Sequence, residues 1–150
     1  MFHAKNYIKV TSLEEAYELN QKKSNAIIGG MLWLKMSNRN MQTAIDLSGL
    51  GLDKIEEQED AFSIGCMCTL RQLEIHEALN RYFGGAMKAC TRHIVGTQFR
   101  NGATVGGSIF GRFGFSDILT CLLALDTYVE LYHAGVIALS EFVEMPRDND

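Results

Sequence analysis

Proline and dense blocks of charge are scarce in this sequence. One proline among 150 residues leaves little material for linkers between independent domains. The 14 basic and 18 acidic side chains give a net charge of -4, and no cluster of Lys and Arg stands out. A protein that binds nucleic acid usually carries such a cluster, so we expect no nucleic-acid partner. With 47% apolar and 21% charged residues, the composition indicates one globular domain, or two small lobes sharing a core.

Long apolar runs are missing as well. The longest, Ile118 to Leu125, is interrupted by Thr120 and is far too short to cross a bilayer. The chain does not open with a charged leader followed by an apolar stretch, so no secretory signal is visible. These features predict a cytoplasmic protein with no membrane partner.

Cysteine and histidine do not occur in a spacing typical of metal sites. Cys66 and Cys68 form a C-x-C pair, which lacks the C-x-x-C geometry of zinc ribbons and redox motifs, and Cys90 and Cys121 stand alone. The histidines are scattered along the chain. We therefore expect no metal site, and buried free thiols in a reducing compartment.

Glycine, in contrast, is concentrated between Thr97 and Asp117, where it alternates with hydroxyl and amide side chains. The segment is too irregular to predict one helix or one strand, and it offers backbone N–H groups that regular structure would not use. Arg100 and Arg112 add positive charge, and Ser116 with Asp117 begins the next helix. From these residues alone, two interpretations stay open: an anion-binding or nucleotide-binding loop, or a surface loop whose glycines serve tight turns.

A second glycine pair, Gly29-Gly30, follows a predicted strand, helix and strand. Residues 7–10 predict the first strand, Ser12 and Glu15 predict a capping box at the start of the helix, and residues 26–28 predict a buried strand. A diglycine at the carboxyl end of a buried strand is a common place for phosphate binding in α/β sheets. It is equally compatible with a tight turn.

The rest of the chain mixes short helices and strands. Gly84-Gly85 is expected to weaken the helix that contains it. The predicted elements are a helical turn over 31–36, packed into the core through Trp33 and its neighbours, a strand over 44–47, hairpins over 54–65 and 127–139, helices over 69–76, 79–91 and 117–125, and a turn from 140.

Four segments match the motifs of one family, in order. Residues 28–30 (IGG) stand where that family has A-G-G-T-D-L, 64–70 (IGCMCTL) is similar to I-G-A-x-T-T-L, 98–107 (QFRNGATVGG) to Q-I-R-N-x-A/G-T-I-G-G, and 116–126 to S-D-L-L-P-A-L-L-A-L-D. The chain thus resembles the FAD-binding subunit, or medium domain, of the molybdenum hydroxylases of the xanthine dehydrogenase, carbon monoxide dehydrogenase and aldehyde oxidase types. The match covers almost the whole chain and favours a ligand-binding loop over simple turns.

The resemblance implies a fold and a cofactor. The fold is α+β and two-lobed, the FAD-binding domain shared with p-cresol methylhydroxylase, with a small α/β lobe over residues 1–51 and a larger α+β lobe over 52–150. FAD is the implied cofactor and would lie between the lobes. The family chain continues into a C-terminal domain that helps enclose the flavin ring. This sequence stops at Asp150, about where that domain would start, so the domain is expected to be absent from it, and two interpretations stay open: a fragment, or a subunit that lacks the domain.

The resemblance also implies a set of site residues. Two N–H-rich loops, one on each lobe, would pair with the diphosphate without needing a lysine. Asp117 would accept a hydrogen bond from a cofactor hydroxyl or cap its helix. No catalytic residue is expected. The expected cofactor-binding residues are Ile28, Gly29, Gly30, Met31, Asn101, Thr104, Gly106, Gly107, Ser108 and Asp117.

Several positions depart from the family pattern. Met31 and Leu32 replace Thr-Asp after the first diglycine, which removes a hydroxyl donor from the phosphate turn. Ser108 stands where Asn is usual. Phe113 and Phe115 make the second loop bulkier than the small residues of the family pattern.

The function implied by the resemblance is that of an oxidoreductase subunit. It would take electrons from a 2Fe–2S partner subunit, supplied in turn by a molybdopterin-binding subunit, and pass them through FAD to NAD or another acceptor. Two other functions stay open. One is a non-catalytic assembly subunit that keeps the fold without tight FAD binding, and the other is a nucleotide-binding module that holds ADP or a similar ligand without redox chemistry.

Overall fold

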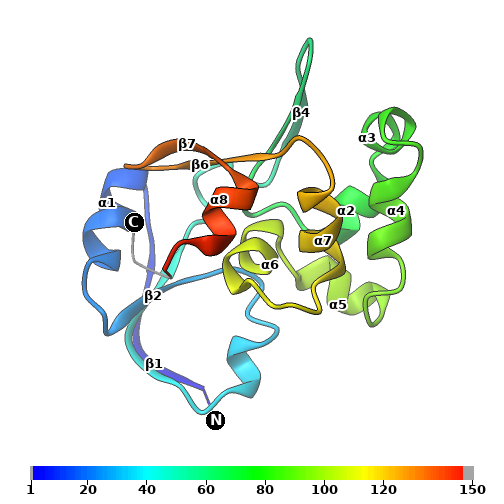
Figure 1. Cartoon of the computed structure of the whole chain (residues 1–150). Helices are drawn as coiled ribbons and strands as arrows, with labels where there is room; N and C mark the ends of the chain where they lie inside the picture. Colours follow the sequence, from blue (N-terminus) through cyan, green and yellow to red (C-terminus); the bar gives the residue numbers. More distant parts are fainter. Residues whose placement is uncertain (1, 147–150) are drawn as a thin grey trace.

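A three-stranded parallel sheet forms the smaller lobe in the computed structural model, which describes residues 2–146 (Figure 1). Its strand order is β1-β3-β2, and the central strand places Ile45, fully buried, beside Ile8 and Ile27. Parallel strands need crossover connections, which α1 and the 3₁₀ turn η1 supply. The elements of this lobe are β1 (His3–Lys9), α1 (Leu13–Asn20), β2 (Asn25–Ile28), η1 (Leu34–Met36) and β3 (Asn40–Asp46).

The start of α1 forms only one of the two hydrogen bonds of the predicted capping box. The Ser12 hydroxyl accepts a hydrogen bond from the Glu15 N–H at 3.1 Å. The Glu15 carboxylate accepts from the backbone N–H of Thr11 at 2.8 Å, instead of from that of Ser12 as expected. The Thr11 hydroxyl donates to the same carboxylate, which explains why the return bond is shifted by one residue.

Short helices and two hairpins make up the larger lobe. The β4–β5 hairpin projects from the body, and the β6–β7 hairpin reaches across to α1 (Figure 1), where the ring of Tyr17 lies 4.1 Å from that of His133. The elements are β4 (Ile55–Glu57), β5 (Phe62–Ile64), α2 (Leu70–Ile75), α3 (Glu77–Tyr82), α4 (Ala86–Thr91), α5 (Thr97–Gly102), α6 (Val105–Gly111), α7 (Asp117–Leu123), β6 (Tyr128–Leu131), β7 (Gly135–Ala138) and α8 (Leu139–Glu144).

Separate apolar cores stabilise the two lobes. In the smaller lobe, one cluster includes Val10 and Ile45, and another includes Ile28 and Met41. In the larger lobe, one extended cluster joins α2, α3, α4, α6, α7 and α8. The expected two-lobed α+β fold is therefore confirmed. We propose that the boundary lies between residues 51 and 52, because the parallel sheet and its covering helix are complete before this point.

Several predicted elements differ in the structure. The helix expected over 79–91 is two helices, because Gly84 and Gly85 adopt φ values of 59° and 82° that end α3 before α4 begins. The segment 97–117, expected to be irregular, contains α5 and α6, and the turn expected from 140 is part of α8. Both predicted hairpins are confirmed. Within residues 2–146, no helix is long and apolar enough to cross a membrane.

Candidate functional site

The two glycine segments meet at a cleft between the lobes, with a volume of about 510 Å³. Ligand sites typically have volumes of this order, with an apolar lining and a few polar groups. Seven of the ten expected site residues line the cleft: Gly29, Gly30, Met31, Thr104, Gly107, Ser108 and Asp117. The other three, Ile28, Asn101 and Gly106, are not among the lining residues.

The first diglycine brings the two lobes into direct contact. A Cβ atom on Gly30 would lie 1.5 Å from the carbonyl oxygen of Gly102, and one on Gly29 would lie 2.5 Å from the Thr104 Oγ1. A side chain at position 30 would collide with backbone, and one at position 29 would force the Thr104 side chain to move, since real Cβ contacts are longer than this. The pair of glycines therefore sets how closely the turn after β2 approaches the larger lobe.

The same turn carries backbone donors that the fold does not use. The N–H groups of Gly29, Gly30, Met31 and Leu32 donate no hydrogen bond to any residue in the described part of the chain. Met31 has φ of 61°, a left-handed conformation that is uncommon for a residue with a side chain. All four residues line the cleft. Successive free N–H groups of this kind form anion-binding concavities in proteins.

The second glycine segment is different, because the N–H groups from Val105 to Ser108, which were expected to be unused, are paired within the fold. The N–H groups of Val105 and Gly106 donate to the carbonyl oxygens of Cys68 and Cys66, each at 2.8 Å. The N–H groups of Gly107 and Ser108 donate to the hydroxyl and the carbonyl oxygen of Thr104. A Cβ atom on Gly106 would lie 2.7 Å from the Cys66 carbonyl oxygen, so this glycine serves packing.

Thr104 supplies a polar group at this side of the cleft. It is 6% exposed, and its hydroxyl oxygen accepts the Gly107 N–H at 3.2 Å. A hydroxyl can accept and donate at the same time, so the proton of Thr104 stays available to an oxygen held by the turn at Gly29. The Ser108 hydroxyl already donates to the Thr104 carbonyl oxygen at 2.9 Å.

The start of α7 resolves the alternative left open for Asp117. The hydroxyl of Ser116 accepts the N–H of Leu119 at 3.3 Å, so Ser116 is the capping residue. Asp117 is exposed in the first helical turn and lines the cleft. Its carboxylate forms no hydrogen bond or ion pair with residues 2–146, which leaves it available as an acceptor.

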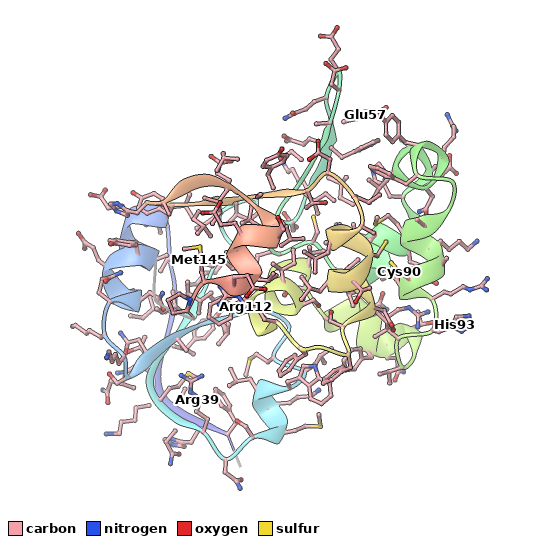
Figure 2. All side chains as sticks on the ribbon, viewed as in Figure 1. Arg39, Glu57, Cys90, His93, Arg112 and Met145 are labelled. Atoms are coloured by element: carbon pink, nitrogen blue, oxygen red, sulfur yellow. The ribbon has the colours of Figure 1, made fainter. Side chains whose placement is uncertain are left out.

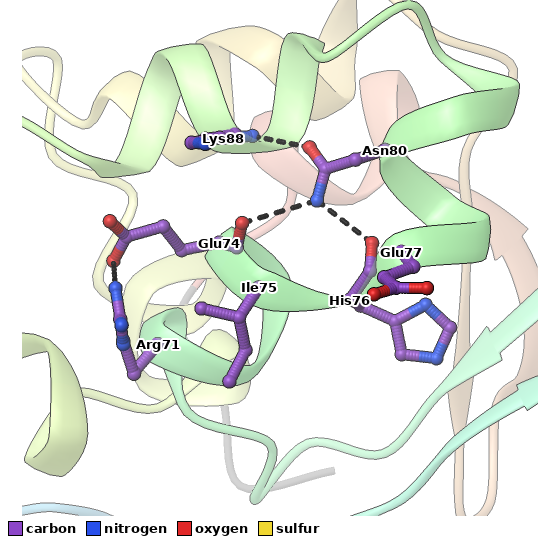
Figure 3. A pocket seen from close by; sticks show the side chains of 7 residues that line it. All are labelled: Arg71, Glu74, Ile75, His76, Glu77, Asn80 and Lys88. Atoms are coloured by element: carbon purple, nitrogen blue, oxygen red, sulfur yellow. Dashed lines mark hydrogen bonds and ion pairs between the residues drawn. The ribbon is translucent and has the colours of Figure 1, made fainter.

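The positive charge expected from Arg100 is neutralised inside the fold. Arg100 is 5% exposed, and its Nε donates to Glu74 at 2.7 Å while its Nη1 donates to the carbonyl oxygen of Ile94. Arg71 forms a second ion pair with Glu74 at 2.9 Å, and Figure 3 shows this pair in a second pocket, which residues of α2, α3 and α4 line. Hydrogen bonds from Arg100 and then Arg71 hold the pKa of Glu74 below its usual value.

Arg112 is also committed to the fold. Its Nη1 donates to the carbonyl oxygen of Met145 at 2.7 Å, and its guanidinium lies 4.1 Å from the centre of the Phe142 ring. Figure 2 shows Arg112 and Met145 beside each other. Arg112 thus ties the loop before α7 to α8. Neither Arg100 nor Arg112 is among the residues that line the cleft.

Four aromatic side chains in the cleft were not predicted as site residues. They are Trp33, Phe99, Phe113 and Phe115. Trp33 was expected in the core, but 56% of it is exposed. The unusual bulk of Phe113 and Phe115 was the sequence signal that could have identified them, whereas nothing in the local pattern distinguished Trp33 from a core residue.

The four cysteines are free thiols, and Cys66 is exposed instead of buried as expected. Burial raises the pKa of the Cys90 thiol to about 12, with further contributions from the neighbouring Cys121. A thiol of this kind is scarcely ionised at neutral pH, which makes it unreactive. In the described part of the chain, no three His, Cys, Asp or Glu side chains converge as they would around a metal ion.

Comparisons with known proteins agree with this geometry. Residues 2–150 match the model of the FAD binding domain in molybdopterin dehydrogenase. The chain is 33% identical to the nicotine 6-hydroxylase medium subunit of Paenarthrobacter nicotinovorans over 131 residues, which cover 83% of this chain and 46% of that subunit. It is 26% identical to the uncharacterized protein YgfM of Escherichia coli (strain K12) over 146 residues, covering 95% of this chain and 55% of YgfM.

Solved structures share the fold. Quinoline 2-oxidoreductase from Pseudomonas putida 86 superposes with a TM-score of 0.84 at 21% identity, over 100% of this chain and 55% of the matched chain. The Cu,Mo-CO dehydrogenase superposes with a TM-score of 0.82 at 21% identity, over 93% of this chain and 52% of the other. The chain thus spans about half the length of the relatives it matches. By the family model, the chain belongs to the FAD-binding domains of the molybdopterin dehydrogenases.

Proposed function

We propose that this chain binds FAD in the cleft between its lobes and acts as an electron-transfer subunit of a molybdenum hydroxylase complex. A 2Fe–2S partner subunit delivers the electrons, a molybdopterin-binding subunit supplies that partner, and NAD or another acceptor receives them. Family membership supports this proposal, as does the relative that is named as the medium subunit of a hydroxylase. The proposed location is the cytoplasm.

The observation that carries the proposal is the run of four unused N–H groups from Gly29 to Leu32, opposite Thr104. A diphosphate carries its negative charge on oxygens that accept hydrogen bonds, so these oxygens can bind the backbone N–H groups that line this side of the cleft. The Thr104 hydroxyl would add a donor from the other lobe. The residues present therefore fit the diphosphate of FAD, and they do so without a lysine.

The other residues would act by shape and orientation. Gly107 keeps the cleft open beside Thr104, because it adds no side chain there. The Asp117 carboxylate would accept a hydrogen bond from a cofactor hydroxyl. Ile28 and Gly106 do not line the cleft and would act by holding the two glycine segments in place. The role of Asn101 stays a proposal based on the motif. When bound, FAD supplies the redox chemistry, and the protein supplies binding and orientation.

The test is the affinity for FAD of a Gly107→Val variant. A Cβ on Gly107 would lie 3.0 Å from the Thr104 Oγ1, and the added methyl groups would occupy the cleft. We expect FAD binding to be lost, as measured by titration calorimetry. Gly96→Val is the control, because Gly96 has open space around it and is not among the cleft-lining residues. Unchanged FAD affinity in Gly107→Val would reject this assignment of the second glycine segment.

One observation favours a second function, a nucleotide-binding or assembly subunit without redox chemistry. The N–H groups of residues 105–108 are all paired inside the protein, so the second segment offers fewer donors than its motif implies. Titration with ADP separates the possibilities. Binding of ADP without FAD indicates a nucleotide module, and binding of neither indicates an assembly subunit.

A further inference from the structure

The aromatic side chains of the cleft form one connected cluster that bridges the lobes. Trp33 comes from the smaller lobe, directly after the turn with the unused N–H groups. Its ring centre lies 6.3 Å from those of Phe99, Phe113 and Phe115, which belong to α5 and to the loop between α6 and α7. Phe113 and Phe115 stack on each other at 5.2 Å with an angle of 13°.

This cluster leaves much aromatic surface in contact with water. Trp33 is 56% exposed, Phe113 40% and Phe115 69%. The distances of 6.3 Å are near the upper end of the range for aromatic pairs, so Trp33 contacts its three neighbours only loosely. Exposed apolar patches of this kind commonly mark binding surfaces. The loose contacts leave room for rearrangement around a further planar group.

The cluster and the donor-rich turn belong to one cleft. Trp33 is the next residue after Leu32, one of the four residues whose N–H groups the fold does not use. In ADP, FMN and FAD a ribose or ribityl group separates the ring from the phosphate. A ligand whose phosphate oxygens bind that turn therefore extends its ring, one spacer away, along the same cleft that the four aromatic side chains line. The available surface there is aromatic, which favours a planar ring with a π-face over a sugar or an aliphatic chain.

We propose that Trp33, with Phe99, Phe113 and Phe115, is a stacking subsite for a planar heteroaromatic ring joined to the diphosphate of the ligand. The inference rests on the proposed function and identifies what holds the ring in this chain. FAD contains two such rings, adenine and isoalloxazine, and ADP and FMN each present one of them. The four side chains close on the ring from both lobes, so stacking also holds the lobes together.

The experiment measures binding of ADP, FMN and FAD by titration calorimetry to the parent chain, Trp33→Ala and Trp33→Phe. Trp33 is the only tryptophan, so its fluorescence gives a second readout for ADP. We expect Trp33→Ala to weaken binding of FAD, and of either ADP or FMN, by about 10-fold or more, and Trp33→Phe to restore most of the affinity. The nucleotide that loses affinity identifies the stacked ring.

Tyr128→Ala is the matched control, because Tyr128 is a 58% exposed aromatic residue on β6 outside the cleft lining. It should bind all three ligands like the parent chain. If Trp33→Ala binds FAD, ADP and FMN as tightly as the parent chain, the stacking subsite is wrong although FAD binding stands. If the parent chain binds no FAD at all, the proposed function fails, and the subsite fails with it.

Discussion

Thr104 connects the two parts of the site through one hydroxyl group. The hydroxyl caps α6 by accepting the Gly107 N–H and lies beside Gly29 on the other lobe. Its oxygen therefore has a structural role, while its proton is available to a ligand. A substitution that keeps the shape and removes the hydroxyl separates these contributions.

Thr104→Val is expected to weaken FAD binding by about 10-fold to 100-fold, since a hydrogen bond to a charged oxygen is worth about 1.5–3 kcal/mol. Calorimetric titration with FAD measures this. Thr69→Val is the matched control, because Thr69 caps α2 in the same way by accepting the Gln72 N–H, outside the cleft lining. Equal FAD affinity in the two variants would show that the Thr104 hydroxyl does not bind the cofactor.

Glu74 forms a buried ion pair with Arg100. Arg100 donates to it from α5 at 2.7 Å, and both side chains are almost completely buried. Breaking this buried pair leaves the Glu74 carboxylate with only the more exposed Arg71 as a partner, so Arg100→Met should lower the free energy of unfolding by roughly 3 kcal/mol. Urea denaturation measures this. Arg71→Met, which removes the more exposed partner, should cost less than about 1 kcal/mol.

At the scale of elements, the Glu74–Arg100 pair joins α2 to α5 and makes the contact dependent on pH. The folded-state pKa of Glu74 is lowered, so the carboxylate binds its proton less readily in the folded chain than in the unfolded one. Its contribution to stability is therefore complete above the unfolded pKa, near 4.5, and is lost as the pH falls through the lower folded value.

The expected result is a decline in the free energy of unfolding below about pH 4.5 that is shallower in Glu74→Gln than in the parent chain. Urea titrations between neutral pH and the acid limit of folding measure both curves. Identical slopes in the two proteins would show that Glu74 has an ordinary pKa in the fold.

The turn after β2 and the end of α5 are in close contact across the lobes. A Cβ on Gly30 would lie 1.5 Å from the Gly102 carbonyl oxygen, and a backbone atom cannot rotate away as a side chain can. Gly30→Ala should therefore lower the free energy of unfolding by at least about 2 kcal/mol and abolish FAD binding. Gly114→Ala, at a glycine with open space, should change neither quantity. Denaturation and FAD titration on both variants test this contact.

Local signals in the sequence predicted many of the elements. The cap at Ser12, the helix that follows Thr69 and the two hairpins all depend on residues close together in the chain. The diglycine at residues 84–85, expected only to weaken one helix, divides it into α3 and α4. The helices α5 and α6 were missed because their glycines disfavour helix, whereas backbone bonds from Val105 and Gly106 to residues 66–68 hold the start of α6. Such bonds between distant segments leave no periodic pattern.

The same limit applies to the site. The family motifs implied that both glycine segments face one ligand, and seven of the ten expected residues line a single cleft. They did not show that Arg100 is paired with Glu74, 26 positions earlier, or that Trp33 is exposed beside Phe113 and Phe115. Both facts depend on how separate elements pack, which determines burial and charge pairing after the chain has folded.

At the scale of the whole molecule, we propose that the two lobes together hold FAD. The most direct test is to purify the chain, add excess FAD, remove the free cofactor, and record the visible absorption spectrum together with a binding titration. We predict a retained flavin band and saturable binding at a single site. A chain that keeps its fold but retains no flavin and shows no saturable FAD binding would contradict the proposed function.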